Sequence, residues 1–376
     1  MAEGKAALVL TGGGARAAYQ VGVLSAIREI RGRRPGNPFP ILCGTSAGGI
    51  NAAALAVYSA DFNAAVRKLA WIWRNFHVDQ VYRADAAALL GTGLRWGSAL
   101  MFGWAVRQTP RSLFDNSPLR RLLGQVLDFS AIERAIHAGD LHAVCVAASG
   151  YSSGENLAFF QAAEGVMPWR RAQRLGMRER LGIDHLLASS AIPFVFPAVK
   201  IHREYFGDGS MRQLAPISPA IHLGADRILV VGSGRLAEEG RQRSDGYPPL
   251  AQIAGHALSS IFLDSLAVDL ERLERINATV GAFSATQREA AGIPLRPIET
   301  LVIAPSKRLD AIAGHHRESL PLALRTVLRG VGAMRREGST LLSYVLFESG
   351  FTRALMELGM QDTMARRDEV AAFLRL

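Results

Sequence analysis

Short apolar runs alternate with segments of helical periodicity over the first half of the chain. Residues 6–14, AALVLTGGG, predict a strand that ends in a glycine turn, and apolar side chains then recur every three or four positions across residues 15–30, as on one face of a helix. The same pairing follows in residues 39–46, FPILCGTS, and residues 47–60. This β-α-β-α order predicts an α/β fold with a mostly parallel central sheet flanked by helices.

Later apolar runs extend the predicted sheet. Each is bounded by turn residues, as buried parallel strands usually are: residues 141–149, 225–234 and 299–306. Residues 236–249 are polar, charged and contain glycine and proline, which favours a mobile loop. We therefore expect a core over residues 1–235, then this loop, then a mostly helical C-terminal region over residues 250–376 that packs on the core and includes the strand near 299–306.

The composition suits a chain with a large buried core. It has 376 residues, of which 49% are hydrophobic, and a formal net charge of +10, which favours anionic partners. No zinc-finger, RRM or basic-zipper pattern accompanies the scattered arginines, so a nucleic-acid partner is not expected. Cys43 and Cys145 lie inside apolar runs, which favours reduced core thiols over a disulfide or a metal site.

The pattern predicts neither a signal peptide nor a membrane-spanning helix. The first strand is predicted to begin at Ala6, which leaves no room for the regions of a signal peptide. The most apolar internal segment, residues 96–106, is far shorter than the roughly 20 residues that cross a bilayer. We therefore expect a cytoplasmic protein, and peripheral contact with the inner membrane face stays open.

Ser46 stands at the centre of a G-x-S-x-G pattern, residues 44–48, between a predicted strand and a predicted helix. In a nucleophile elbow, small neighbours allow a tight turn that lifts the serine clear of the backbone. The helix that follows also aims its free N–H groups at the reaction centre. A serine that only caps the helix would leave the same pattern, so the motif alone leaves both interpretations open.

Gly12, Gly13 and Gly14 form a second glycine turn after a predicted strand. In a parallel sheet both turns lie at the carboxyl edge, so N–H groups of this loop can face an oxyanion near Ser46, with Arg16 close by. The loop also satisfies the relaxed G-x-G-x-x-G/A dinucleotide fingerprint. The next strand, however, ends without the carboxylate that the ribose requires, and the P-loop G-K-[ST] is missing, so both nucleotide interpretations are disfavoured.

A serine nucleophile needs a base, and Asp208 is the best candidate. It lies between Gly207 and Gly209, directly after Tyr205 and Phe206, whereas none of the nine histidines stands in a glycine-rich turn after a convincing strand. A carboxylate there is either a turn-former or a group positioned for function. In a dry site its pKa would rise toward that of a workable general base.

Three ordered segments resemble the patatin-like phospholipase family: GGGARAAYQVGVL, GTSAGG and DGS. The stretches LLASSAIPFVFPAV and PISPAIHLGADRILVV, on either side of the last segment, also resemble the family, and the similarity spans about residues 5–235. Residues 343–363 have the look of the helical tail of bacterial members, for which a packing helix is the default interpretation.

The resemblance implies a three-layer α/β/α fold and a serine acyl hydrolase that needs no metal or other cofactor. Such enzymes act on phospholipid, lysophospholipid or other acyl esters. The resemblance further implies Ser46 as nucleophile and Asp208 as its base without a histidine. It implies an oxyanion hole in the Gly12–Gly14 loop and at Ala47, and a role for Arg16 in ordering that loop or meeting substrate phosphate.

Two positions depart from the family pattern. Ala17 stands where the family often has glycine, and Ser210 follows Asp208-Gly209 where glycine or alanine is usual. Both are small residues, so they affect the expected backbone geometry and leave the expected pair intact.

Residues 89–111 offer an amphipathic entrance for a membrane lipid. Their aromatic and sulfur-containing side chains lie among arginines: Trp96, Met101, Phe102, Trp104, Arg95, Arg107 and Arg111. This pattern suits a lid or membrane-contact element, and an ordinary pair of core helices is the competing interpretation.

Two other functions stay open from the sequence. An alcohol or thiol could intercept an acyl-serine, which would make the chain an acyltransferase, or the chain could be a catalytically idle lipid-binding protein. Intact Ser46 and Asp208 argue against the idle protein. The oligomeric state is not indicated.

Overall fold

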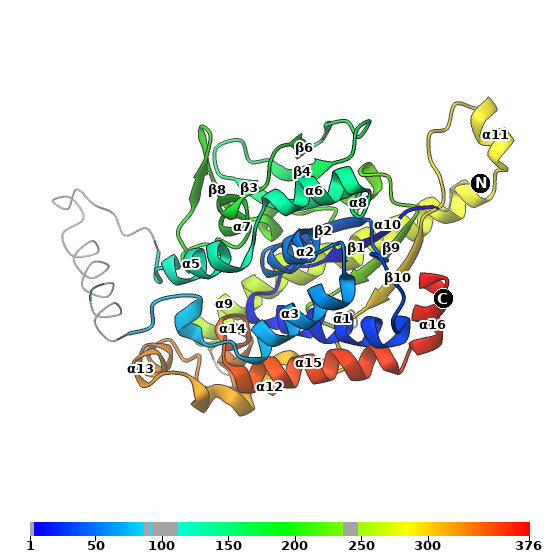
Figure 1. Ribbon diagram of the computed structural model, residues 1–376. Helices are drawn as coiled ribbons and strands as arrows, with labels where there is room; N and C mark the ends of the chain where they lie inside the picture. Colours follow the sequence, from blue (N-terminus) through cyan, green and yellow to red (C-terminus); the bar gives the residue numbers. More distant parts are fainter. Residues whose placement is uncertain (1–3, 86–90, 92–111, 236–246) are drawn as a thin grey trace.

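The computed structural model describes residues 4–85, 91, 112–235 and 247–376 (Figure 1). Apart from Gly91, the expected lid or membrane-contact segment, residues 89–111, lies outside the described residues. Most of the expected loop over residues 236–249 lies outside them as well.

A ten-stranded mixed sheet runs through the molecule in the order β10-β9-β1-β2-β3-β4-β6-β5, with β8 paired to β3 and β7 paired to β8. The strands are β1 (Ala6–Leu10), β2 (Ile41–Thr45), β3 (Ala143–Gly150), β4 (Asn156–Ala162), β5 (Trp169–Arg171), β6 (Arg174–Arg178), β7 (Val199–Ile201), β8 (Glu204–Asp208), β9 (Arg227–Val231) and β10 (Glu299–Ile303). Strands β10, β9, β1, β2 and β3 are parallel to one another, and they are the five apolar runs that the sequence predicts.

The rest of the sheet joins β3 through antiparallel pairs and was not among the predicted apolar runs. Strands β4 and β8 both pair with β3 in antiparallel register, and β5 and β6 continue the sheet beyond β4. Strands β5 and β6 carry several arginines, so they lack the apolar run that marks a buried strand. The sheet is therefore mixed: the five predicted strands form one parallel block, and β4 and β6 form a second parallel pair.

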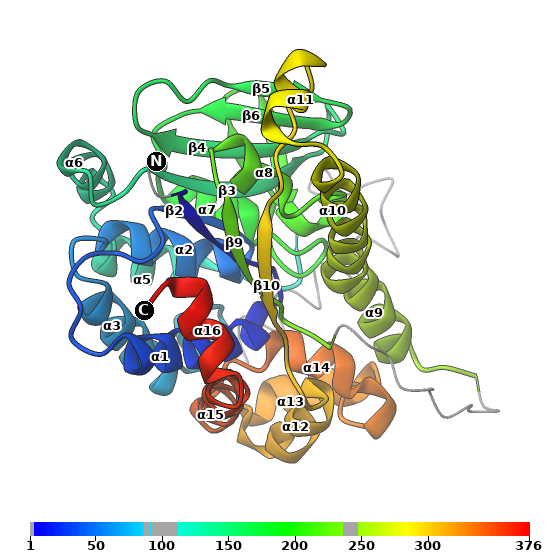
Figure 2. The same ribbon diagram turned by 90° about the vertical axis from the view of Figure 1, so that its right-hand side faces the viewer.

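Helices cover both faces of the sheet and give the three-layer arrangement expected from the sequence (Figure 2). The α-helices are α1 (Ala18–Arg31), α2 (Ala47–Val57), α3 (Phe62–Arg74), α5 (Ser117–Val126), α6 (Ser130–Ala138), α7 (Ile183–Ser189), α8 (Ser218–His222), α9 (Leu250–Ser259), α10 (Ser265–Gly281), α11 (Ala285–Ala290), α12 (Leu309–His316), α13 (Leu322–Gly330), α14 (Ser339–Val345), α15 (Ser349–Met364) and α16 (Arg367–Leu374).

Side chains along β1 point alternately to the two faces of the sheet and so belong to two separate hydrophobic cores. Leu8 and Leu10 join the larger core, which includes residues of α1, α2, α3 and α15. Ala7 and Val9 point to the other face, where α8 and α10 complete a smaller core. Both layers are needed because parallel strands are usually buried on both faces.

Cys43 and Cys145 are partners in the register of β2 and β3, on the face covered by the smaller core. Both are buried and neither forms a disulfide. The expectation of reduced core thiols is confirmed.

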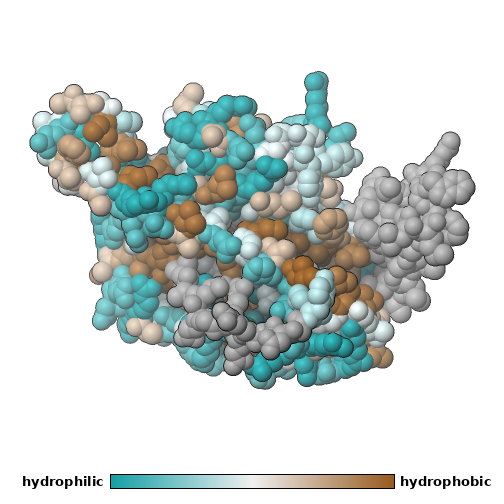
Figure 3. All heavy atoms as spheres, turned by 180° about the vertical axis from the view of Figure 1, so that it is seen from behind, coloured by the Kyte–Doolittle hydropathy of each residue, from teal (hydrophilic) through white to brown (hydrophobic). Residues whose placement is uncertain are grey.

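One helical run among the described residues, Leu250–Gly281, is long and apolar enough to cross a membrane by length and composition, with a mean hydropathy of 1.3. In this fold one side of the run packs inward, where Leu266 and Leu273 belong to the smaller core. Leu250, Ile253 and Val268 are exposed on its other side, and hydrophobic residues gather on the face of the molecule that Figure 3 shows. The most apolar stretch of the run is 28% buried, so the run packs on the molecule by one side and leaves most of its surface exposed.

Candidate active site

Ser46 occupies a tight turn between β2 and α2. Its backbone has φ 55° and ψ −132°, a conformation that residues other than glycine rarely adopt. The turn is crowded, because a Cβ on Gly48 would overlap the backbone oxygens of Leu10 and Thr11 at the end of β1. The Ser46 N–H donates a hydrogen bond of 2.8 Å to Ser189 Oγ, and Ser46 is only 1% exposed. The geometry is that of a nucleophile elbow.

Asp208 reaches the same region from the far side of β3. Thr45, next to Ser46, pairs with Ala147, while the following residue of β3, Ala148, pairs with Asp208. The Asp208 N–H donates a hydrogen bond of 2.9 Å to the backbone oxygen of Ala191. Ser46 and Asp208, which are far apart in sequence, are thus both tied to the segment that ends α7.

The Asp208 carboxyl is fully buried, and its burial raises its pKa to about 6. Interactions with the Ser46 hydroxyl and with the N–H and hydroxyl of Ser210 stabilise the carboxylate and limit this rise. The Ser210 N–H donates a hydrogen bond of 2.9 Å to Oδ1, whereas Oδ2 accepts a full hydrogen bond from no described residue. One carboxyl oxygen is therefore held, and the other is available to a proton.

The Gly12–Gly14 loop packs too closely for side chains. A Cβ on Gly14, whose φ is 55°, would overlap the backbone oxygen of Tyr344, and a Cβ on Gly12 would overlap the Ser210 side chain. The Ser233 hydroxyl donates a hydrogen bond to the Gly12 backbone oxygen. Gly14, Ser46 and Ala47 all line the same cavity.

Arg16 is buried and holds the glycine loop to the C-terminal region. Its side chain is 4% exposed, its Nε donates a hydrogen bond of 2.8 Å to Ser343 Oγ, and its guanidinium lies 3.9 Å from the centre of the Tyr344 ring. Of the two roles that the resemblance allows, these contacts are the ones expected of a residue that orders the loop.

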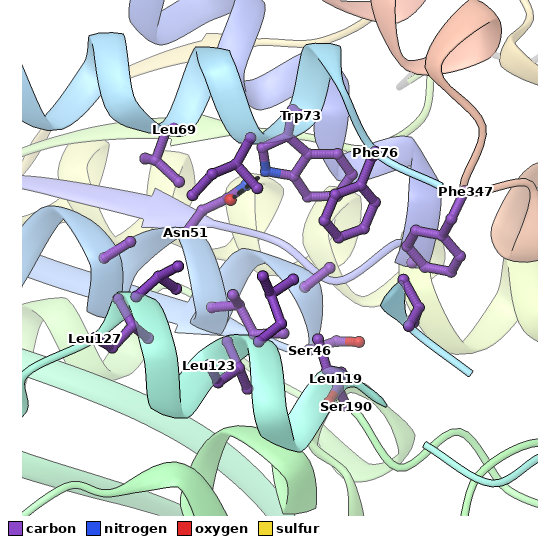
Figure 4. A pocket seen from close by; sticks show the side chains of 18 of the residues that line it. Ser46, Asn51, Leu69, Trp73, Phe76, Leu119, Leu123, Leu127, Ser190 and Phe347 are labelled. Atoms are coloured by element: carbon purple, nitrogen blue, oxygen red, sulfur yellow. Dashed lines mark hydrogen bonds between the residues drawn. The ribbon is translucent and has the colours of Figure 1, made fainter. Parts of the chain in front are cut away.

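An apolar cavity opens beside Ser46 and follows α2, with about 850 Å³ of empty space including its opening to solvent. Residues of α2, α3 and α5 form its walls, and Phe347 closes one side (Figure 4). The buried polar wall residue Asn51 is satisfied within the protein, because it accepts a hydrogen bond of 2.9 Å from Trp73 Nε1 and donates one of 3.0 Å to Gln20 Oε1. The cavity thus suits an alkyl chain better than a polar group.

A sequence model of the patatin-like phospholipase family matches residues 8–221, which is more than half of the chain. The chain belongs to the patatin-like phospholipase family. The family match covers every residue that the sequence proposes for the site, from Gly12 to Asp208, and membership supports a phospholipase-type lipid hydrolase.

Among known relatives, this patatin-like chain is similar to a protein of Pseudomonas aeruginosa named a cGAMP-activated phospholipase. The two are 28% identical over 218 residues, which is 56% of this chain and 53% of the relative. The match thus spans about half of the relative's length. Among solved structures, VipD from Legionella pneumophila aligns with a TM-score of 0.38 at 13% identity, covering 98% of this chain and 67% of that one.

The sequence alone did not identify the residues that support the patatin-like elbow or line the cavity. Ser189 was part of a segment recognised only by resemblance, and a lone serine at a helix end carries no chemical signal of its own. Trp73 lies on the apolar face of a strongly amphipathic helix, which is the signature of an ordinary core helix. Phe347 comes from a different region of the chain, so only the fold brings it to Ser46.

No group of three or more His, Cys, Asp or Glu residues that could hold a metal occurs among the described residues. All nine histidines lie in the described part of the chain, and none lines the cavity. The titratable group in the described residues that interacts with the Ser46 hydroxyl is the Asp208 carboxyl.

Proposed function

We propose that this chain is a serine acyl hydrolase that cleaves lipid esters with Ser46 as nucleophile and Asp208 as its base. The observation that carries the proposal is the apolar cavity that opens beside Ser46, next to a buried carboxyl whose pKa is raised to about 6. A buried carboxyl with a raised pKa is the kind of group that accepts and returns a proton near neutral pH.

The proposed reaction has two halves. Ser46 Oγ attacks the ester carbonyl carbon while its proton passes to Asp208, and the oxyanion lies against N–H groups of the Gly12–Gly14 loop and Ala47. Asp208 then returns the proton to the departing alcohol or lysolipid oxygen as the C–O bond breaks. In the second half, water gives a proton to Asp208 and attacks the acyl carbon. The bond to Ser46 Oγ then breaks, Asp208 returns the proton to Oγ, and the fatty acid leaves.

The experiment compares wild type with Ser46→Ala on a panel of phospholipids, lysophospholipids and neutral acyl esters, and measures released fatty acid by mass. We expect Ser46→Ala to lose nearly all turnover and to lose labelling by a fluorophosphonate. Ser25→Ala is the matched control, because this serine lies on α1 and its hydroxyl donates to the backbone oxygen of Val21. Full turnover by folded Ser46→Ala would refute the assignment.

Acyl transfer is the competing outcome of the same assay. If wild type consumes the ester and the acyl group appears on an added alcohol or thiol instead of as free fatty acid, the reaction is a transfer. Labelling of Ser46 without turnover of any ester would instead indicate the idle lipid-binding protein.

We also propose a cytoplasmic location with peripheral contact at the inner membrane face. The net charge of +10 supports this proposal, because that membrane face carries anionic lipid.

A further inference from the structure

The cavity runs along the whole of α2. Ser46 stands at the start of this helix and Tyr58 follows its last residue, and both line the cavity. With a rise of 1.5 Å per residue, the distance from Ser46 to Tyr58 along the helix is about 18 Å. In Figure 4, Ser46 and Ser190 lie toward one end of the cavity, and Leu69 and Leu127 lie at the other.

At the far end, near the surface, the cavity is lined by three hydrogen-bonded residues that we call the distal clasp: Tyr58, Lys68 and Val126. The Tyr58 hydroxyl donates a hydrogen bond of 2.6 Å to the backbone oxygen of Val126 and accepts one from Lys68 Nζ. The Lys68 ammonium also lies 4.1 Å from the centre of the Tyr58 ring. All three residues line the cavity, and they join the end of α2 to α3 and α5.

The distal clasp changes the chemistry of the wall. Between Ser46 and the clasp the wall is built from apolar side chains such as Ile50, Ala54 and Leu69. At the clasp, a hydroxyl, an ammonium and a carbonyl satisfy one another. An alkyl chain that extended past this point would have to separate these groups and would meet the exposed Lys68 ammonium and solvent, so its further methylenes would bury no more apolar surface.

We propose that the cavity holds the acyl chain of the ester and that the distal clasp sets the longest chain that binds fully extended. About 18 Å accommodates roughly fourteen carbons, because a C–C bond near 1.5 Å advances an extended zigzag chain by about 1.3 Å per carbon. Tyr58 and Lys68 are thus specificity-determining residues. This inference rests on the proposed function, because it takes Ser46 as the point where the carbonyl carbon lies.

The test is a chain-length profile of kcat/KM on simple acyl esters of six to eighteen carbons. We expect the wild-type value to rise with length, by roughly fourfold for each methylene at about 0.8 kcal/mol, and to stop rising near fourteen carbons. Tyr58→Ala removes the hydroxyl and ring of the distal clasp, so kcat/KM should continue to rise to chains longer than fourteen carbons.

A variant with a larger side chain in the cavity wall tests whether the acyl chain occupies the cavity. Ala54 lies on α2 between Ser46 and Tyr58, so Ala54→Phe should leave room for roughly nine carbons. We expect a loss of roughly tenfold or more on fourteen-carbon esters relative to eight-carbon esters. Ala65→Leu, on the facing helix, is a second blocker if Ala54→Phe does not fold. Arg67→Ala is the matched control, since Arg67 neighbours Lys68 on α3 and does not line the cavity.

The outcomes separate the inference from the proposed function. The inference is overturned, while the proposed hydrolysis stands, if Tyr58→Ala and a folded blocking variant both show the wild-type dependence of kcat/KM on chain length. If wild type hydrolyses no ester, the proposed function fails, and the inference is then judged by native mass spectrometry with free fatty acids of eight to eighteen carbons. Binding that shows no length limit, or no binding at all, would overturn it there.

Discussion

At the scale of single residues, the candidate site concentrates unfavourable conformations and charges. The Ser46 backbone is in a region that costs a residue other than glycine about 1–3 kcal/mol. Asp208 is completely buried, so its ionised form is destabilised relative to water. Both unfavourable free energies belong to the two residues that we propose to react. The packing around Ser46 and Asp208 keeps them in these conformations.

The raised pKa of Asp208 predicts that Asp208→Asn is more stable than wild type above pH 6. The carboxyl has a pKa of about 6 when folded and 3.8 as its ordinary value. Wild-type stability from this group is therefore complete below pH 4 and is lost as pH rises through about 6, a change on the order of 3 kcal/mol. Asparagine keeps the Oδ1 acceptor for the Ser210 N–H and carries no charge. Urea unfolding at pH 4 and pH 8 measures the difference.

The same variant separates catalysis from stability. Wild-type turnover should fall as pH drops through about 6, because the base must be ionised, and Asp208→Asn should show almost no turnover at any pH. An Asp208→Asn protein that is less stable than wild type at pH 8, or a wild-type rate that is flat from pH 5 to 8, would contradict the buried ionised carboxyl.

The residues that we propose to react stand out in the sequence because their neighbours are unusual. Glycines surround Ser46 and Asp208, and in the structure a Cβ on Gly44, Gly48 or Gly209 would overlap backbone atoms. Ser189, whose hydroxyl oxygen accepts a hydrogen bond from the Ser46 N–H, has no such glycine neighbours in the sequence, so the sequence pattern does not indicate its role.

At the scale of elements, α15 packs directly against α1. A Cβ on Gly359 would overlap the backbone oxygen of Tyr19, and a Cβ on Gly22 would overlap that of Met356. The Tyr19 hydroxyl donates a hydrogen bond of 3.0 Å to Asp362 Oδ2 in the same crossing. The helical tail is therefore part of the layer that covers the sheet, which agrees with the packing role expected from the sequence.

This crossing predicts that Gly359→Ala is strongly destabilising. The added methyl group meets backbone instead of a flexible side chain, so the two helices must separate, and we expect a loss of about 3 kcal/mol in the free energy of unfolding. Gly314→Ala in α12 is the control. Its Cβ meets nothing within 4 Å, so it should raise stability by about 0.5–1 kcal/mol. Chemical unfolding that ranks Gly359→Ala at or above Gly314→Ala would contradict the close approach.

The elements themselves were predictable to different degrees. Strands β1, β2, β3 and β9 are buried along their whole length and β10 is partly buried, and each contains an apolar run by which the sequence identifies it. Strands β5 and β6 lie at the edge beyond β4, carry arginines and are mostly not buried, so no such run marks them. The cavity could not be predicted at all, because apolar faces of α2, α3 and α5 look like core faces until the fold leaves space between them.

At the scale of the whole molecule, the net charge of +10 predicts how the protein meets a membrane. It should sediment with vesicles that contain anionic phospholipid, and binding should weaken as salt rises, because the Debye length falls from about 30 Å at 0.01 M to about 10 Å at 0.1 M. Neutral vesicles of the same size are the control, and Ser46→Ala protein keeps the lipid intact during the measurement. Equal sedimentation with neutral and anionic vesicles, or binding that is insensitive to salt, would exclude a contact driven by charge. The salt dependence separates this surface attraction from acyl-chain binding, because an uncharged alkyl chain in the buried cavity is not subject to ionic screening.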